Sequence, residues 1–230
     1  MQFHSLDTAL VVIDPQNDFL SEKGASWKLV GASVMENGII EHLDQLFDAA
    51  KQGDYPVFVS PHYFYPTDHE WQINGPLEEL ELKTNTFGRD GPLDLTNFAD
   101  SGADWLDRFK QYIEDGKTVV ASPHKVFGPQ TNDLTLQLRK RKINKIILAG
   151  MLANMCVESH LREFLEQGFE VIIVKDAIAG PQHPEWGDGY KAALVNYHYL
   201  AHAVLTTATA VKAMKGSAAA RSRSRSRSRK

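Results

Sequence analysis

The fold is decided by the segment Asn144–Asp176, which opens with Asn-Lys-Ile-Ile-Leu-Ala-Gly-Met-Leu-Ala-Asn-Met-Cys-Val-Glu-Ser-His. Within it, Ile146–Ala149 is a short apolar run that predicts a buried strand, followed by a turn. Apolar side chains then recur at helical spacing until Gly168, and a second apolar block covers Glu170–Val174. This order of strand, helix and strand is a βαβ unit, which predicts a parallel sheet.

The only cysteine of the chain, Cys156, falls in the first turn of the helix predicted within this unit. Free N–H groups and the positive end of the helix dipole favour a thiolate there. A lone cysteine can equally be a small buried apolar residue. Its position at the strand-to-helix turn favours the interpretation of Cys156 as a nucleophile.

Length and composition favour one α/β domain, which we expect over residues 1–215. The chain has 230 residues, of which 43% are hydrophobic, enough for one core. One cysteine cannot form an internal disulfide, and no apolar run approaches the roughly 20 residues that span a bilayer. The first residues also lack the pattern of a signal peptide. We therefore expect a cytoplasmic protein with no membrane partner.

The charges are unevenly distributed between the body of the chain and its end. The chain has 25 basic and 29 acidic residues, a net charge of −4. Six of the basic residues belong to the tail, namely Arg221, Arg223, Arg225, Arg227, Arg229 and Lys230, so the remainder has a net charge of −10. Phosphate binding needs clustered Lys and Arg, and we therefore expect no nucleic-acid partner.

Residues 216–230 form an Arg/Ser tail that has almost no apolar side chains to bury. Such a composition predicts disorder. An expression remnant, a natural basic tail and a phosphorylatable arm are all consistent with it.

Further apolar runs alternate with helical patterns along the chain. Strands are predicted at Thr8–Ile13, Pro56–Val59, Thr118–Ala121 and Ala203–Thr206. Helices are predicted at Val34–Gln52, after a loop through Ser33, and at Trp105–Ile113, Thr131–Arg139, Gly189–Ala201 and Ala208–Met214. This alternation predicts a three-layer, doubly wound α/β fold around a mainly parallel six-stranded sheet.

Three of the predicted strands lead at their ends to ionisable side chains that can take part in catalysis, namely Asp14, Lys125 and Cys156. In open α/β sheets, ligands bind beyond the carboxyl ends of the strands, so these side chains are expected to meet there. Taken alone, Asp14 could be a capping residue and Lys125 a surface lysine.

The segment between Ser60 and Gly102 is irregular and aromatic, which predicts a functional lid or a contact surface. Candidate substrate-binding residues are Gln16, Phe19, Tyr63, Trp71, Phe87 and Phe127. Core or interface roles for the aromatic residues stay open. His62 and His69 suggest a metal only weakly, because no Asp-x-His spacing accompanies them.

Two motifs identify a resemblance. An apolar strand leads into Asp14-Pro-Gln-Asn-Asp-Phe19, and a later strand leads into Gly150-Met-Leu-Ala-Asn-Met-Cys-Val157. With these motifs, the chain resembles the isochorismatase-like cysteine hydrolase superfamily over roughly residues 6 to 214. That superfamily includes nicotinamidases, carbamoylsarcosine amidohydrolases, and ureidoacrylate and biuret hydrolases.

The resemblance implies a catalytic triad in which Cys156 is the nucleophile, Asp14 the general base and Lys125 the cation. It also implies a cis peptide bond between Met151 and Leu152, with the N–H groups of Leu152 and Cys156 as oxyanion donors. No cofactor is implied, and a homodimer or homotetramer is expected.

The chain departs from the superfamily pattern at three places. Ala153 replaces a small hydroxylated residue, and the segment after Lys125 is shorter than in many members. The metal motif of nicotinamidases falls on Pro61, Tyr63 and His69, of which only His69 keeps a ligand. We therefore expect no metal.

Three functions are compatible with these observations. The first is a cysteine hydrolase that cleaves a C–N bond of a small amide, ureide or carbamoyl compound through a thioester. The second is a vinyl ether hydrolase of the isochorismatase type, which does not need the cysteine. The third is a non-catalytic interaction protein that uses the basic tail.

Overall fold

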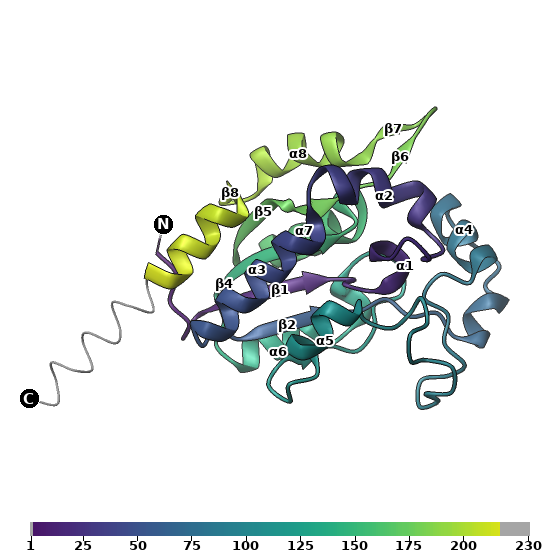
Figure 1. The fold of residues 1–230 in the computed structure, drawn as a ribbon, viewed down its shortest axis with the longest axis horizontal. Helices are drawn as coiled ribbons and strands as arrows, with labels where there is room; N and C mark the ends of the chain where they lie inside the picture. Colours follow the sequence, from purple (N-terminus) through teal and green to yellow (C-terminus); the bar gives the residue numbers. More distant parts are fainter. Residues whose placement is uncertain (1, 217–230) are drawn as a thin grey trace, which may run out of the picture.

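A computed structural model describes residues 2–216, and its middle layer is a six-stranded parallel sheet (Figure 1). The strand order is β3-β2-β1-β4-β5-β8. The strands are β1 (Thr8–Ile13), β2 (Val57–Ser60), β3 (Val119–Val120), β4 (Lys145–Met151), β5 (Glu170–Ala179) and β8 (Ala203–Leu205). The predicted doubly wound, six-stranded α/β fold is confirmed.

Helices cover both faces of this sheet (Figure 1). They are α1 (Asn17–Leu20), α2 (Trp27–Glu36), α3 (Ile39–Gln52), α4 (Pro76–Thr84), α5 (Asp107–Ile113), α6 (Leu134–Lys140), α7 (Glu158–Glu166) and α8 (Gly189–Leu200). A further helix includes residues 207–216. A π-helical turn, η3 (Ala153–Val157), precedes α7, and a small hairpin of β6 (Gln182–His183) and β7 (Gly187–Asp188) precedes α8.

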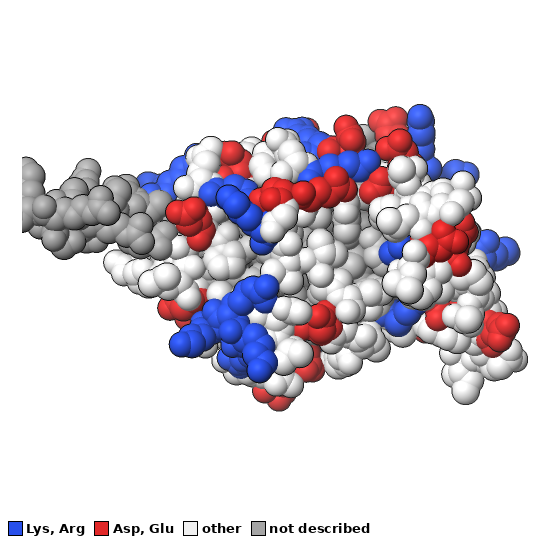
Figure 2. Space-filling model, turned by 90° about the horizontal axis from the view of Figure 1, so that it is seen from below, with Lys and Arg blue, Asp and Glu red and all other residues white. Residues whose placement is uncertain are grey.

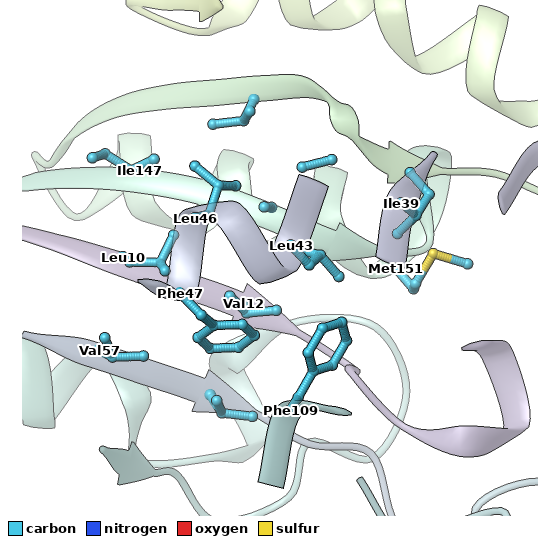
Figure 3. Close-up of a cluster of buried hydrophobic side chains, with 14 of the residues drawn as sticks. Leu10, Val12, Ile39, Leu43, Leu46, Phe47, Val57, Phe109, Ile147 and Met151 are labelled. Carbon is cyan, nitrogen blue, oxygen red and sulfur yellow. The ribbon is translucent and has the colours of Figure 1, made fainter. Parts of the chain in front are cut away.

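The two apolar layers take alternate residues of the same strands, as the pleat of a strand requires. On one face, Leu10 and Val12 of β1 pack against α3, α5 and the last helix. Figure 3 shows part of this layer, in which Leu43 and Phe47 of α3 lie over the strands. On the other face, Val11 packs with side chains from α6, α7 and α8. The central strands β1, β4 and β5 are thus held between apolar layers, whereas Val120 of the edge strand β3 is exposed. This leaves the ends of the central strands as the place for polar groups.

The N-terminal helical region differs from the prediction. A helix was predicted over Val34–Gln52 after a loop, whereas the structure has α2 and α3 separated at Gly38. Gly38 adopts a left-handed conformation with φ 59°, which ends one helix and sets a new direction for the next. Val30 and Val34, four residues apart, are buried on one face of α2. The irregular segment between Ser60 and Gly102 likewise contains α4, which begins with Pro76.

Residues 217–230, which hold nearly all of the predicted Arg/Ser tail, lie outside the described residues. No helix within residues 2–216 combines the length and the apolar character needed to cross a bilayer. On the face drawn in Figure 2, basic and acidic side chains form small separate groups with uncharged surface between them.

Gly150 provides a test of how closely β4 approaches β1. Its φ is 117°, and a Cβ at this position would lie 2.1 Å from the backbone oxygen of Ile13. We expect Gly150→Ala to lower the free energy of unfolding by about 3 kcal/mol or more, because backbone atoms of a buried strand cannot move aside.

Gly116→Ala is the matched control for this measurement by urea denaturation. Gly116 also has a positive φ, of 72°, but its Cβ would meet nothing within 4 Å. Only the conformational cost of about 1 kcal/mol is expected there. Equal losses in the two variants would show that the close approach to Ile13 does not matter.

Candidate active site

Two of the predicted catalytic residues meet at the carboxyl edge of the sheet. Strands β1 and β4 are neighbours, and Ile13 pairs with Gly150. Asp14 and the turn after β4 therefore lie side by side at the same edge of the sheet. Asp14 is completely buried and has a left-handed backbone with φ 49°. Its N–H donates to the carbonyl of Ser60 at 3.0 Å. This conformation turns the carboxyl group out of the strand direction, toward η3.

Cys156 lies in η3 rather than in the first turn of a regular helix, and only 2% of its surface is exposed. Burial raises the pKa of the Cys156 thiol well above its usual value, and the charges of Asp14 and Glu81 raise it further. A backbone hydrogen bond from Leu152 opposes this rise. The expected thiolate at a helix start is therefore wrong for the resting state, because burial and two carboxyl groups outweigh the local backbone dipoles.

The Asp14 carboxyl group forms a hydrogen bond with this thiol and can accept its proton. Burial raises the pKa of Asp14 to about 7, while His62, His160 and a hydrogen bond with the Cys156 thiol lower it. The Asp14 carboxyl group is thus partly ionised at neutral pH and can take the proton of the thiol.

His124 is the residue that holds the Asp14 carboxyl group. Its Nε2 lies 2.9 Å from Oδ1 of Asp14, and both side chains are fully buried. The other carboxyl oxygen, Oδ2, has no hydrogen-bond partner of regular geometry within residues 2–216. His124 directly precedes Lys125, and the sequence predicted a role for the lysine only.

Lys125 does not reach Asp14 in the structure. Its Nζ donates to Asp68 at 2.5 Å and to the carbonyl of Tyr63 at 2.9 Å, and it lies 3.8 Å from the centre of the Tyr65 ring. Lys125 therefore faces the aromatic loop, while the side chain of the adjacent His124 faces Asp14 at the sheet edge.

Three histidines form a buried group around Asp14. His62 and His160 have ring centres 4.7 and 5.2 Å from that of His124. Burial lowers the pKa of each of the three to about 3, so they are neutral at physiological pH. His160 joins this group to Cys156, since its Nδ1 lies 2.7 Å from the Cys156 carbonyl oxygen.

Asp14, His62 and His124 also satisfy the distance requirement for a metal site, with one potential ligand atom of each within 4.8 Å of the others. Hydrogen bonds engage one nitrogen of each histidine, whereas Nδ1 of both histidines and Oδ2 of Asp14 have no hydrogen-bond partner of regular geometry within residues 2–216. Nε2 of His124 is bonded to Asp14, and Nε2 of His62 lies 2.9 Å from the carbonyl oxygen of Lys125. We interpret the group as a hydrogen-bonded network.

Three of the six predicted substrate-binding residues lie in the interior. Gln16 donates to the carbonyls of His62 and Ala103, both at 2.9 Å, and accepts the N–H of His62 at 3.0 Å. Its amide therefore ties three segments together, and both of its N–H groups are already engaged. Phe19 and Phe87 pack edge to face with ring centres 4.7 Å apart, both in the core.

The other three predicted residues lie in different surroundings. Tyr63 is buried beside Trp105, and the guanidinium of Arg89 lies 4.6 Å from its ring centre. Trp71 packs against Phe64. Phe127 is the one among the six that lines the large cavity described below.

The turn between β4 and η3 contains a cis peptide bond between Met151 and Leu152, at the position that the sequence predicts. The carbonyl of Leu152 accepts the N–H groups of Met155 and Val157 at 3.2 and 3.0 Å. This pattern of bonds forms the π-helical turn that carries Cys156. Ala153, where the sequence departs from the superfamily, accepts a 2.5 Å hydrogen bond from Tyr197 through its carbonyl.

Known proteins resemble this chain over most of its length. The isochorismatase domain family matches residues 8–209. The chain is 28% identical over 198 residues to ureidoacrylate amidohydrolase RutB of Pseudomonas savastanoi pv. phaseolicola, covering 83% of this chain and 76% of that protein. It is also 28% identical over 178 residues to nicotinamidase 3 of Arabidopsis thaliana, covering 74% and 72%.

Among solved structures, the fold is similar to that of a cysteine hydrolase from Pseudomonas syringae pv. phaseolicola. The TM-score is 0.76 at 20% identity, over 94% of this chain and 96% of that one.

Alkylation of Cys156 by iodoacetamide tests whether Asp14 acts as its base. Asp14 accepts a proton only when ionised, and its pKa is about 7. The alkylation rate should therefore rise between about pH 6 and about pH 8 and then level off. Asp14→Asn should lower the rate at pH 7 by about tenfold or more. A rate that keeps rising through pH 9, as for an isolated thiol, would exclude the pairing.

Proposed function

The chain belongs to the isochorismatase family, and we propose that it is a hydrolase that cleaves a C–N bond of a small amide, ureide or carbamoyl compound through a cysteine thioester. The observation that carries this proposal is the buried pair of Asp14 and Cys156 at the carboxyl edge of the sheet. The names of two relatives, an amidohydrolase and a nicotinamidase, support the reaction class.

In the first step, the ionised Asp14 carboxylate takes the proton of the Cys156 thiol, and the sulfur attacks the substrate carbonyl carbon. The C–N bond then breaks, and the leaving ammonia or amine receives the proton from Asp14. Because His124 occupies Oδ1, the unpaired Oδ2 is the oxygen that would carry this proton.

In the second step, water attacks the thioester carbon while Asp14 accepts a proton from the water. The C–S bond breaks, the proton passes to the sulfur, and the acid product leaves. The N–H groups of Leu152 and Cys156 are the proposed donors to the negative oxygen of both tetrahedral intermediates. In the free protein, Leu152 already bonds to the sulfur, which supports a backbone donor at this point. Loss of one such donor typically costs about 3 kcal/mol of transition-state stabilisation.

We assign to His124 the position beside Asp14 that the resemblance gives to Lys125. A neutral histidine donates a hydrogen bond without adding a fixed positive charge, so Asp14 keeps a pKa near neutrality. A lysine in direct contact would lower that pKa and weaken the base. The triad of this protein is then Asp14, His124 and Cys156, with Lys125 bound to Asp68 in the aromatic loop.

Cys156→Ala separates the proposed mechanism from a vinyl ether hydrolase. Assays of ammonia release from a panel of small amides and ureides should show a loss of about four orders of magnitude or more, because the nucleophile is gone. Cys156→Ser, which keeps a weaker nucleophile, is the matched control for packing. Activity that survives in the alanine variant would exclude a thioester.

His124→Phe and Lys125→Met test which residue supports the base. Without the donor from His124, the Asp14 carboxylate loses stabilisation, so the acid limb of kcat/KM should move up by about one pH unit. Lys125→Met should leave that limb in place, and His124→Asn, which keeps an N–H donor, should restore part of the loss. A shift in the lysine variant alone would return Lys125 to the triad.

The third function, an interaction protein acting through the basic tail, falls on residues outside the described part. A chain ending at Lys215 that retained full hydrolase activity would separate that tail from catalysis. The predicted homodimer or homotetramer stays a prediction, measurable by light scattering.

A further inference from the structure

We infer that the substrate carries a bulky apolar group, aromatic or branched aliphatic, next to its scissile amide, and that this group binds in a cavity beside the Cys156 turn. The reaction at the amide rests on the proposed function. The apolar group is deduced from the cavity alone.

The cavity has a volume of about 720 Å³, within the range of about 300–1,000 Å³ that ligand sites usually have. Its walls come from α2, the start of α4, η3, the β6–β7 hairpin and the start of α8. Figure 1 shows α2, α4 and the hairpin gathered at the end of the molecule opposite to its two termini.

The cavity adjoins the nucleophile through the backbone. Asn154 and Met155, the two residues before Cys156, form part of its wall. Both belong to η3, which also carries Cys156. Because these two residues directly precede Cys156 in the chain, a ligand in the cavity lies beside the turn that carries the proposed nucleophile.

The walls of the cavity are mainly apolar side chains, contributed by Leu29, Leu77, Leu80, Met155 and Trp186. Two of the polar wall residues are already engaged. Asp188 accepts the N–H of Lys191 at 3.0 Å and forms an ion pair with its amine at 3.1 Å. His183 stacks on Trp186 with ring centres 4.1 Å apart and accepts the N–H groups of Glu185 and Trp186.

Asn154 differs from these polar neighbours. Its Oδ1 is buried, and within residues 2–216 it has no hydrogen-bond partner. Gly189 makes room for it, since a Cβ there would lie 2.5 Å from this oxygen. A buried acceptor without a donor is costly, and an amide N–H of the substrate would satisfy it. The wall thus selects an apolar group, and Asn154 selects an N–H beside it.

The first arm of the test is hydrolysis by the wild-type protein of two amides that differ in the acyl group, acetamide and phenylacetamide. We expect kcat/KM for phenylacetamide to be higher by about tenfold or more, because its ring fills the apolar cavity. Similar values for the two amides, with hydrolysis of both, would overturn the inference and leave the proposed function standing.

The second arm measures binding without turnover, by calorimetric titration of phenylacetamide into Cys156→Ala. Leu80→Asp, added to that variant, places a charge in the wall and should weaken binding about tenfold or more. Leu136→Asp on α6 is the matched control, because Leu80 and Leu136 are both exposed, at 44% and 56%, and only Leu80 lines the cavity.

The binding arm separates the two proposals. Binding that depends on Leu80 supports the cavity even if no amide is hydrolysed, in which case the proposed function alone fails. Absent binding, or equal binding by the two aspartate variants, overturns the inference. A change of oligomeric state in Leu80→Asp without weaker binding would show instead that this surface contacts a second copy of the chain.

Discussion

A carboxyl group without exposed surface must be neutralised or hydrogen bonded, because water no longer stabilises its charge. Asp14 is such a group, and the arrangement of the site follows from how its charge is accommodated. Burial raises its pKa to about 7, and a hydrogen bond with His124 fixes one oxygen. The remaining oxygen is left without a regular partner, on a carboxyl group that interacts with the Cys156 thiol. Burial thus raises the pKa of Asp14 into the range in which its carboxyl group suits the proposed role of a base.

The same burial determines the state of the nucleophile. Within residues 2–216, the charged groups that act on the Cys156 thiol are the carboxyl groups of Asp14 and Glu81, and the three nearby histidines are neutral. Burial raises the pKa of Glu81 to about 8, so Glu81 is mainly protonated at neutral pH and its negative charge acts on the thiol only at higher pH. A thiol of this kind becomes reactive by giving its proton to Asp14 rather than by being ionised in advance.

Reaction and recognition use different parts of the fold. The proposed catalytic groups lie at the ends of buried strands and in the turn after β4, where close packing and bonds such as those of Gln16 hold them in place. The cavity is formed largely by α2, α4 and the β6–β7 hairpin, which lie outside the six-stranded sheet. Proteins with a common fold can therefore keep one site chemistry and change their substrates through these peripheral elements.

The sequence by itself determined the sheet and the position of the proposed nucleophile, because apolar runs, helical spacing and two motifs are local properties of the chain. It also indicated Asp14, which directly follows a buried strand. Only the tertiary structure showed that His124 contacts Asp14 whereas Lys125 contacts Asp68, since two adjacent residues of a loop differ in the direction of their side chains and not in their place along the chain. It equally decided that Gln16, Phe19 and Phe87 are interior residues, because their partners are distant in sequence. The protonation state of Cys156 depends on how many side chains surround it, a quantity that arises only when the chain is folded.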